Sequence, residues 1–189
     1  MRQSITIEKD MKNMMLETNR LILRTPGIQD VQEYLAFRNS EFVLRYNAMN
    51  KQTLEQAENY FSHENSGEQK LILQQKASGK AIGMVFITED SLRWDVSSKE
   101  ISYYLAESYA RQGYMTEALT AVIRYLFENE EVSCITARSF APNTASRRLL
   151  STLGFCQDGV LRRGVRGYEN VVFDDAVYSL LKEEWKASC

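Results

Sequence analysis

The spacing of apolar residues alternates along this chain between the two-residue period of β-strands and the three- to four-residue period of α-helices. Strand-like runs cover residues 20–24, 70–76, 80–88, 99–107 and 132–139, and two more lie between residues 160 and 181. Helix-like runs cover residues 27–40, 53–64, 113–128 and 141–155. This order predicts an α/β (α+β) fold with one mostly antiparallel mixed sheet of about seven strands and about four helices on its faces. At least one crossover between parallel strands is expected, and the segment 162–170 looks like a loop.

Length and charge limit the functional classes. A chain of 189 residues with 44% hydrophobic residues is expected to form one compact domain. Its 23 basic and 25 acidic residues give a net charge of -2, which provides no overall attraction to nucleic acid. The longest apolar runs, such as residues 82–87, are much shorter than the ~20 residues of a membrane-spanning helix. We therefore expect a cytoplasmic protein with neither a nucleic-acid nor a membrane partner, and the N-terminus does not look like an export signal.

Cysteine and histidine usage predicts that the protein has no metal site. Cys134, Cys156 and Cys189 are widely spaced and are expected to be free thiols. The single His63 lies in a helix-like segment and is expected at the surface. Carboxylates, hydroxyls, backbone amides and a bound cofactor are then the groups that remain for chemistry.

The strongest local signal is a strand ending near Glu107, a short loop, and a helix that begins at residues 113–116. Unpaired N–H groups at such a helix start form an anion site of phosphate size, and Gly113 permits close backbone approach. Arg111 adds a positive charge. The alternative is that Gly113 only relieves strain at an ordinary helix start, and this segment alone leaves both interpretations open.

Residues 109–118, YARQGYMTEA, resemble the phosphate loop of the GCN5-related N-acetyltransferase (GNAT) family, Gln/Arg-x-x-Gly-x-Gly/Ala, often followed by Tyr-Ala-Thr-Glu-Ala. Arg111 stands where the first glycine usually does, and Met115 where the second small residue does, so the fit to phosphate is expected to differ. Four more segments are similar, in family order, to the ribosomal-protein-alanine N-acetyltransferase-like branch: residues 16–30, 100–107, 143–155 and 173–185. The resemblance implies a GNAT-type fold, one domain over residues 15–189, and a flexible extension over residues 1–14.

The resemblance implies acetyl-CoA as co-substrate and direct acetyl transfer to a primary amine within a ternary complex, with no metal. The acceptor is a protein N-terminus or a small-molecule amine. The thioester carbonyl would bind the backbone N–H of Leu105 or Ala106. The other residues implied for the cofactor are Arg111, Gln112, Gly113, Tyr114 and Met115 at the pyrophosphate, Asn143 at the pantetheine arm, and Arg147 at the adenosine phosphates. The alternatives are an N-cap for Asn143 and a solvated side chain for Arg147.

Glu100 is the candidate base for the amine proton, because a partly buried carboxylate has a raised pKa. The alternative for Glu100 is a solvated strand residue, and Asp175 and Glu169 are weaker rivals. Ser146 matches the family's Asn-x-x-Ser motif and is the candidate acid for the departing thiolate. A serine in the first turn of a helix also often makes only local hydrogen bonds.

Further residues have two interpretations each. Tyr103, Tyr104 and Tyr114 either line the cleft or pack in the core. Arg162, Arg163 and Arg166 with Tyr168 either hold an acidic group of the acceptor or form a solvated loop. A non-catalytic acyl-CoA-binding module is the alternative function. A general nucleotide-binding protein is disfavoured because GxxxxGK[ST] and GxGxxG sequences are absent. A homodimer is a further expectation from the family.

Overall fold

The computed structural model describes residues 14–62 and 68–188, with side chains up to residue 185. One sheet of eight strands runs through these residues in the order β1-β2-β3-β4-β5-β6-β8-β7. The strands are β1 (Met15–Glu17), β2 (Leu21–Arg24), β3 (Glu68–Gln75), β4 (Ala81–Glu89), β5 (Ser98–Leu105), β6 (Cys134–Phe140), β7 (Cys156–Arg166) and β8 (Val172–Leu181). Neighbouring strands are antiparallel except β5 and β6, which are parallel. The predicted fold class is confirmed.

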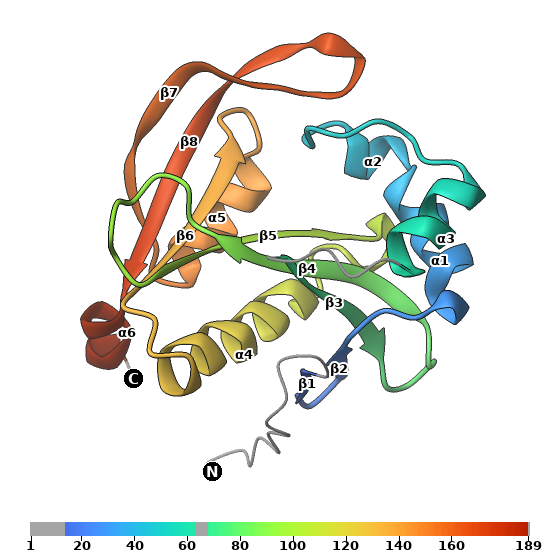
Figure 1. Cartoon of the computed structure of the whole chain (residues 1–189), viewed down its shortest axis with the longest axis horizontal. Coiled ribbons are helices and arrows are strands. Elements are labelled where there is room, and N and C mark those ends of the chain that lie inside the picture. The colour runs from blue at the N-terminus through green and yellow to red at the C-terminus, as the bar shows by residue number, and fades with distance from the viewer. Residues whose placement is uncertain (1–13, 63–67, 189) are drawn as a thin grey trace.

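Helices cover both faces of this sheet. They are α1 (Val31–Arg38), α2 (Glu41–Leu44), α3 (Leu54–Ser62), α4 (Tyr114–Asn129), α5 (Thr144–Thr152) and α6 (Lys182–Ser188), with short 3-10 turns η1 (Ile28–Asp30), η2 (Glu107–Tyr109) and η3 (Tyr168–Asn170). In Figure 1, α4 runs along one face, while α1, α2 and α3 gather at the end of the molecule away from β7 and α6. The crossover between parallel β5 and β6 contains α4, as the sequence predicted.

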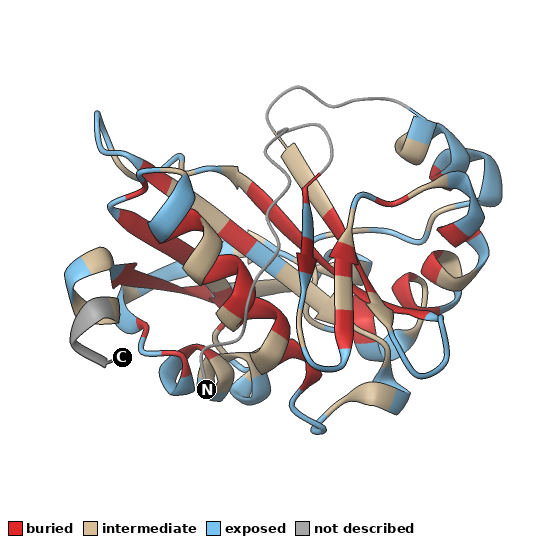
Figure 2. Ribbon diagram, turned by 90° about the horizontal axis from the view of Figure 1, so that it is seen from below, coloured by how far each residue is buried: buried red, intermediate tan, exposed pale blue. Residues whose placement is uncertain are grey.

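The sheet has a separate apolar core on each side. The larger one packs α4 and α5 against the strands through residues such as Ile101, Leu119 and Leu150. Figure 2 shows the buried residues along the strands and along the helices packed against them. The smaller one joins α1 and α3 to β4 through Tyr34 and Phe86. Alternation along β5 therefore sends successive side chains to different cores.

The parallel strands β5 and β6 separate near the middle of the sheet. Their pairing runs only from Ser98 opposite Cys134 to Ile101 opposite Ala137. Both strands continue beyond this point, β5 to Leu105 and β6 to Phe140. The sheet thus contains an opening whose edges are the C-terminal halves of these two strands.

The prediction of a loop over residues 162–170 is wrong for its first half. Residues 162–166 belong to β7, which continues to Arg166 through register shifts after Gln157 and after Leu161. These bulges, with Arg163 in a left-handed conformation at φ 52°, break the two-residue alternation that identifies a strand.

Three short elements were not predicted. β1 and α2 span three and four residues, which is too short for a period to be recognised, and α6 lies at the end of the chain. Residues 1–13, His63 and Cys189 lie outside the described residues. Met14, the last residue of the expected extension, is buried in the larger core at 3% exposure. Cys134 and Cys156 are free thiols, as expected.

Candidate active site

The loop before α4 is shaped by two left-handed residues. Arg111 has φ 59°, and Gly113, the N-cap of α4, has φ 79°. The left-handed region costs a residue with a side chain about 1–2 kcal/mol, a cost that Gly113 avoids and Arg111 does not. Within the described part of the chain, no backbone N–H of residues 111–116 donates to a protein acceptor. Such a run of amides at a helix start is an anion-binding concavity.

The side chains that follow Gly113 point into the protein. Met115 is buried at 7% exposure in the larger core, so its side chain is directed away from the surface that a phosphate would meet. Tyr114 is buried at 8%, and its hydroxyl accepts a hydrogen bond of 2.6 Å from Gln75. Arg111 remains exposed at the rim of the loop.

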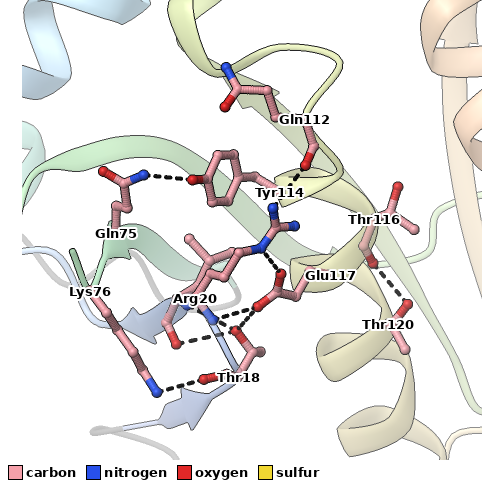
Figure 3. A network of polar contacts seen from close by, with 10 residues as sticks. Thr18, Arg20, Gln75, Lys76, Gln112, Tyr114, Thr116, Glu117 and Thr120 are labelled. Carbon is pink, nitrogen blue, oxygen red and sulfur yellow. Dashed lines mark hydrogen bonds and ion pairs between the residues drawn. The ribbon is translucent and has the colours of Figure 1, made fainter. Parts of the chain in front are cut away.

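Arg20, in the turn just before β2, holds this loop in place (Figure 3). The Arg20 Nε donates to the Glu117 carboxylate over 2.6 Å, and its Nη1 donates to the Gln112 carbonyl oxygen over 2.9 Å. The same guanidinium lies 4.3 Å from the centre of the Tyr114 ring. Thr18 donates to the other Glu117 oxygen over 2.6 Å. The turn between β1 and β2 thereby fixes the first turn of α4 and the residue before it.

Arg20 also brings positive charge to the loop. Its Nη2 would lie 3.4 Å from a Cβ placed on Gly113, and its side chain is 43% exposed. Burial acts to raise the pKa of Glu117, but the hydrogen bonds from Thr18 and Arg20 outweigh it and hold the pKa below its ordinary value. Sequence reasoning assigned no role to Arg20. The only signal was its place within the family-like segment 16–30.

Of the two amides predicted for the thioester carbonyl, one is already occupied. The Ala106 N–H donates to the Ile82 carbonyl over 2.8 Å. Leu105 stands opposite Gly83 in the antiparallel pairing, and the Ala106 bond makes this a non-hydrogen-bonded pair. The N–H of Leu105 therefore points away from β4, toward the opening between β5 and β6.

Tyr103 and Ser146 meet beside this opening. Their hydroxyl oxygens lie 2.9 Å apart, with Ser146 in the first turn of α5 and Tyr103 packed against the larger core. Burial is the main cause that raises the pKa of Tyr103 to about 12, and the Ser146 hydrogen bond opposes it. The phenol thus stays protonated at neutral pH.

Asn143 and Arg147 each have hydrogen-bond partners within the protein. The Asn143 side-chain oxygen accepts from the Ser146 N–H over 3.2 Å, which is the N-cap alternative. Arg147 donates to the Tyr178 hydroxyl over 3.0 Å and to Gln157 over 3.3 Å. It faces β8 and β7, which β6 separates from β5. The structure does not bring Arg147 together with the phosphate loop.

Glu100 lies on the opposite face of β5 from Tyr103. Burial is the first cause that raises the pKa of Glu100 above its ordinary value; Arg138 acts in the other direction, and Asp90 and Asp175 add to the increase. Asp175, the rival base, is 2% exposed and accepts from the Arg138 Nε over 2.6 Å. Its carboxylate is therefore committed to an ion pair, while Glu100 forms none within the described residues.

The remaining candidates lie in β7, in η3 and in the smaller core. Glu169 is exposed in η3, with φ 56°. The exposed residues Arg162 and Arg163 belong to β7, and Tyr168 lies in η3. Tyr104 packs in the smaller core, 5.4 Å from Phe86, so its packing interpretation holds.

An aromatic cluster that sequence reasoning missed bridges two parts of the molecule. The ring of Tyr46, just after α2, lies 6.4 Å from Phe140 and 6.2 Å from Phe173. Phe140 ends β6 and Phe173 lies near the start of β8. These rings are far apart in the sequence and showed no common pattern there.

Comparison with known proteins agrees with this geometry. A family model described as an acetyltransferase (GNAT) domain matches residues 20–156. The chain belongs to this family. As a GNAT N-acetyltransferase it is an acyltransferase, and the recognition made from the phosphate loop is confirmed.

Individual GNAT relatives cover nearly the whole chain. The uncharacterized N-acetyltransferase YoaA of Bacillus subtilis (strain 168) is 31% identical over 174 residues, which cover 88% of this chain and 96% of YoaA. The ribosomal-protein-S5-alanine acetyltransferase of Vibrio fischeri has a TM-score of 0.78 at 19% identity, covering 91% of this chain and 98% of its own. RimJ of Mycobacterium smegmatis, in complex with CoA-disulfide, has a TM-score of 0.73 at 17% identity, covering 89% and 88%. At these identities the two solved structures show a shared fold.

None of the helices in residues 14–62 and 68–188 has both the length and the continuous apolar surface of a transmembrane span. The same residues contain no group of three or more His, Cys, Asp or Glu side chains that could hold a metal ion.

Proposed function

We propose that this N-acetyltransferase uses acetyl-CoA to acetylate a primary amine by direct attack in a ternary complex. One observation carries the proposal: Tyr103 and Ser146 lie on one face of the opening between β5 and β6, Glu100 lies on the other face, and the loop with the unpaired amides of residues 111–116 follows the end of β5. A donor and an acceptor can therefore approach the same point from two faces of the sheet. We further propose that residues 15–189 act as one domain in the cytoplasm.

Acetyl-CoA is the donor that fits the first face. Its pyrophosphate would bind the amides around Gly113, with the guanidinium groups of Arg20 and Arg111 nearby. The thioester carbonyl would accept from the Leu105 N–H, which points toward the opening and away from β4. A fixed N–H donor of this kind stabilises the negative charge that develops on the oxygen during attack. The M. smegmatis RimJ structure contains CoA-disulfide, which agrees with a CoA-type ligand in this fold.

Glu100 is the proposed base on the second face. The amine nitrogen attacks the carbonyl carbon, its proton passes to the Glu100 carboxylate directly or through water, and the C–S bond breaks. Half-burial suits this role because it brings the pKa of Glu100 closer to neutral pH, where a general base works best.

The departing CoA thiolate takes its proton from the Tyr103–Ser146 pair. Ser146 was the predicted acid, and Tyr103 adds a second hydroxyl in direct contact with it. Glu100 then releases the amine proton to water while the pair takes up a proton from water, so both groups return to their starting states. Asn143 positions Ser146 by capping α5, so its proposed contribution at the cofactor is through the helix start.

The acceptor is proposed as a primary amine, either a protein N-terminus or a small molecule. The V. fischeri relative is named for a ribosomal-protein alanine, and this supports testing peptide N-termini first. No acceptor class is favoured by charge alone, because the face around Glu100 contains Arg138 as well as Asp175 and Asp90.

The test is release of CoA thiol from acetyl-CoA with a panel of peptides and small amines. Wild type should turn over at least one acceptor, and Glu100→Gln should lose about a hundredfold or more of the rate. Glu107→Gln, which removes an exposed carboxylate from η2, is the matched control and should keep the rate. Acetyl-CoA at about 100 times its dissociation constant should stabilise the fold by roughly 2.7 kcal/mol. Absence of this stabilisation would refute the donor, and stabilisation without turnover on any amine would refute the reaction.

A further inference from the structure

A pocket lies on the side of α5 that faces β7 and β8. Its volume is about 380 Å³, within the usual range of small-molecule sites. The lining residues are Thr144, Arg147, Arg148, Ser151, Phe155, Gln157 and Tyr178. The proposed acetyl transfer uses none of these side chains.

The pocket contains positive charge without a matching negative charge. Arg147 donates only to neutral oxygens: the Tyr178 hydroxyl, the Ala141 carbonyl at 3.2 Å and the Gln157 amide at 3.3 Å. Within the described residues neither Arg147 nor Arg148 forms an ion pair. A guanidinium has five N–H donors, so Arg147 keeps donors that these three contacts do not use.

The position of Arg147 is fixed in advance. Its three partners come from β8, from the segment between β6 and α5, and from β7, so the side chain is held at three points. Ordering a free arginine side chain costs up to about 2 kcal/mol of conformational entropy. A ligand that meets an arginine already held in place avoids much of that cost.

The other lining groups define the chemistry of a ligand. Thr144 and Ser151 contribute hydroxyls from the same face of α5, each about one turn from the arginines. Phe155 contributes an aromatic wall. Two guanidinium groups with hydroxyls match the several oxygens of a phosphate, and the ring matches an adjacent flat or apolar group.

We infer that this pocket binds a phosphate monoester, with the phosphate at Arg147 and Arg148 and its organic part against Phe155. The occupant we infer is a separate small phosphorylated ligand and not the ribose phosphate of the cofactor, because Arg147 faces β8 and β7 and not the phosphate loop. The inference does not depend on acetyl transfer, because it concerns binding at side chains that the reaction leaves unused.

The experiment follows the Nε–Hε signals of Arg147 and Arg148 by NMR while phenyl phosphate is added to the full-length protein. Both signals should shift and saturate. Arg148→Gln removes an exposed charge that holds no part of the fold, and it should weaken the apparent affinity about tenfold. Arg162→Gln, an exposed arginine farther along β7, is the control and should leave the affinity unchanged. Arg147→Gln should abolish saturation, and its melting temperature checks that the variant is folded.

Two added arms test whether the phosphate belongs to the cofactor. If neither CoA nor dephospho-CoA prevents binding of phenyl phosphate, the occupant is a separate ligand. If CoA prevents binding and dephospho-CoA does not, the phosphate site belongs to CoA and the inference is overturned. Shifts that never saturate, or equal affinity in wild type and Arg148→Gln, would overturn the inference. Failure of acetyl transfer would leave these measurements unaffected, so the two proposals fail independently.

Discussion

The hydroxyl oxygen of Tyr103 lies 2.9 Å from that of Ser146, at the place where β5 and β6 part. Replacing Tyr103 with Phe removes this hydroxyl and keeps the ring that packs against the larger core. Because burial raises the pKa of Tyr103 to about 12, the group is a hydrogen donor at every pH where the enzyme would be assayed. We expect kcat to fall by about a hundredfold, the usual contribution of a general acid, with a smaller change in KM for acetyl-CoA.

Ser146→Ala tests whether the two hydroxyls act together. If they form one proton path, the double variant should be about as slow as the slower single variant, because coupled residues are not additive. If the fold-reduction in kcat of the double variant equals the product of the two single fold-reductions, the hydroxyls act separately. An unchanged kcat in Tyr103→Phe would remove Tyr103 from the mechanism.

Glu100 makes a prediction about pH. Its carboxylate must be deprotonated to act as a base, and its pKa is raised, chiefly by burial. The ratio of kcat/KM between wild type and Glu100→Gln should therefore increase with pH and level off above the pKa of Glu100, at a higher pH than an ordinary glutamate near 4.3 would give. Taking the ratio cancels the titration of the amine. A ratio that does not change with pH would rule out Glu100 as the base.

The same variant should be more stable than wild type. A carboxyl group with a higher pKa in the folded protein than in the unfolded protein binds its proton more tightly in the folded state. As the pH rises through these two pKa values, ionisation of the Glu100 carboxyl therefore destabilises the folded protein. Glu100→Gln should thus raise the melting temperature at neutral pH, and the difference should disappear below about pH 4. Glu107→Gln is the control and should show no such pH-dependent gain.

Much of the fold was predictable because its segments are long and regularly patterned. The hairpin of β3 and β4, the amphipathic α4, and the capping of α5 by Asn143 with Gly154 at φ 91° all follow from local sequence. β7 was partly missed because its bulges interrupt alternation, a property of its pairing with β8 that the residues of β7 alone do not reveal.

The site was less predictable than the fold. The unpaired amides near Gly113 follow from the backbone geometry of a helix N-terminus. A loop followed by the start of a helix was therefore enough to predict them. The contact of Arg20 with Glu117 joins residues 97 positions apart, and that of Tyr103 with Ser146 joins residues 43 apart. Such pairs form only after the sheet is assembled. The direction of Arg147, toward β8, likewise depends on the packing of α5.

Arg20→Gln should weaken acetyl-CoA binding about tenfold, because it removes a charge beside Gly113 and the bond to the Gln112 carbonyl. The pKa of Glu117 is held low, so its contribution to stability is present above the unfolded pKa and is lost as pH falls through the folded one. The free energy of unfolding of Arg20→Gln should therefore be lower than that of wild type by at most about 1 kcal/mol at pH 7, because the Arg20–Glu117 pair is partly exposed. The difference should be smaller in acid.

Lys76→Gln is the control for Arg20, because Lys76 also carries a charge in this corner and pairs with Glu17 at 2.7 Å without touching the loop. Its affinity for acetyl-CoA, measured by calorimetry, should stay close to that of wild type. If both variants bind acetyl-CoA more weakly than wild type by the same factor, the positive charge of this region, and not a specific contact of Arg20, contributes to cofactor binding.

Gly83 gives a test of the Leu105 amide that changes no functional side chain. A Cβ on Gly83 would lie 2.7 Å from the Tyr104 carbonyl oxygen and 2.9 Å from the Leu105 Cδ1 atom. Gly83→Ala should therefore push the end of β5 and misplace the Leu105 N–H. We expect kcat to fall by about tenfold or more, since small displacements of a positioned group are costly. Affinity for CoA itself should change less, because the amides around Gly113 are not moved.

Gly79→Ala serves as the comparison. Gly79 has φ 71° in an open turn, so this substitution should lower the stability of the fold without lowering kcat. Equal loss of kcat in both variants would attribute the effect to stability alone and remove the support for Leu105.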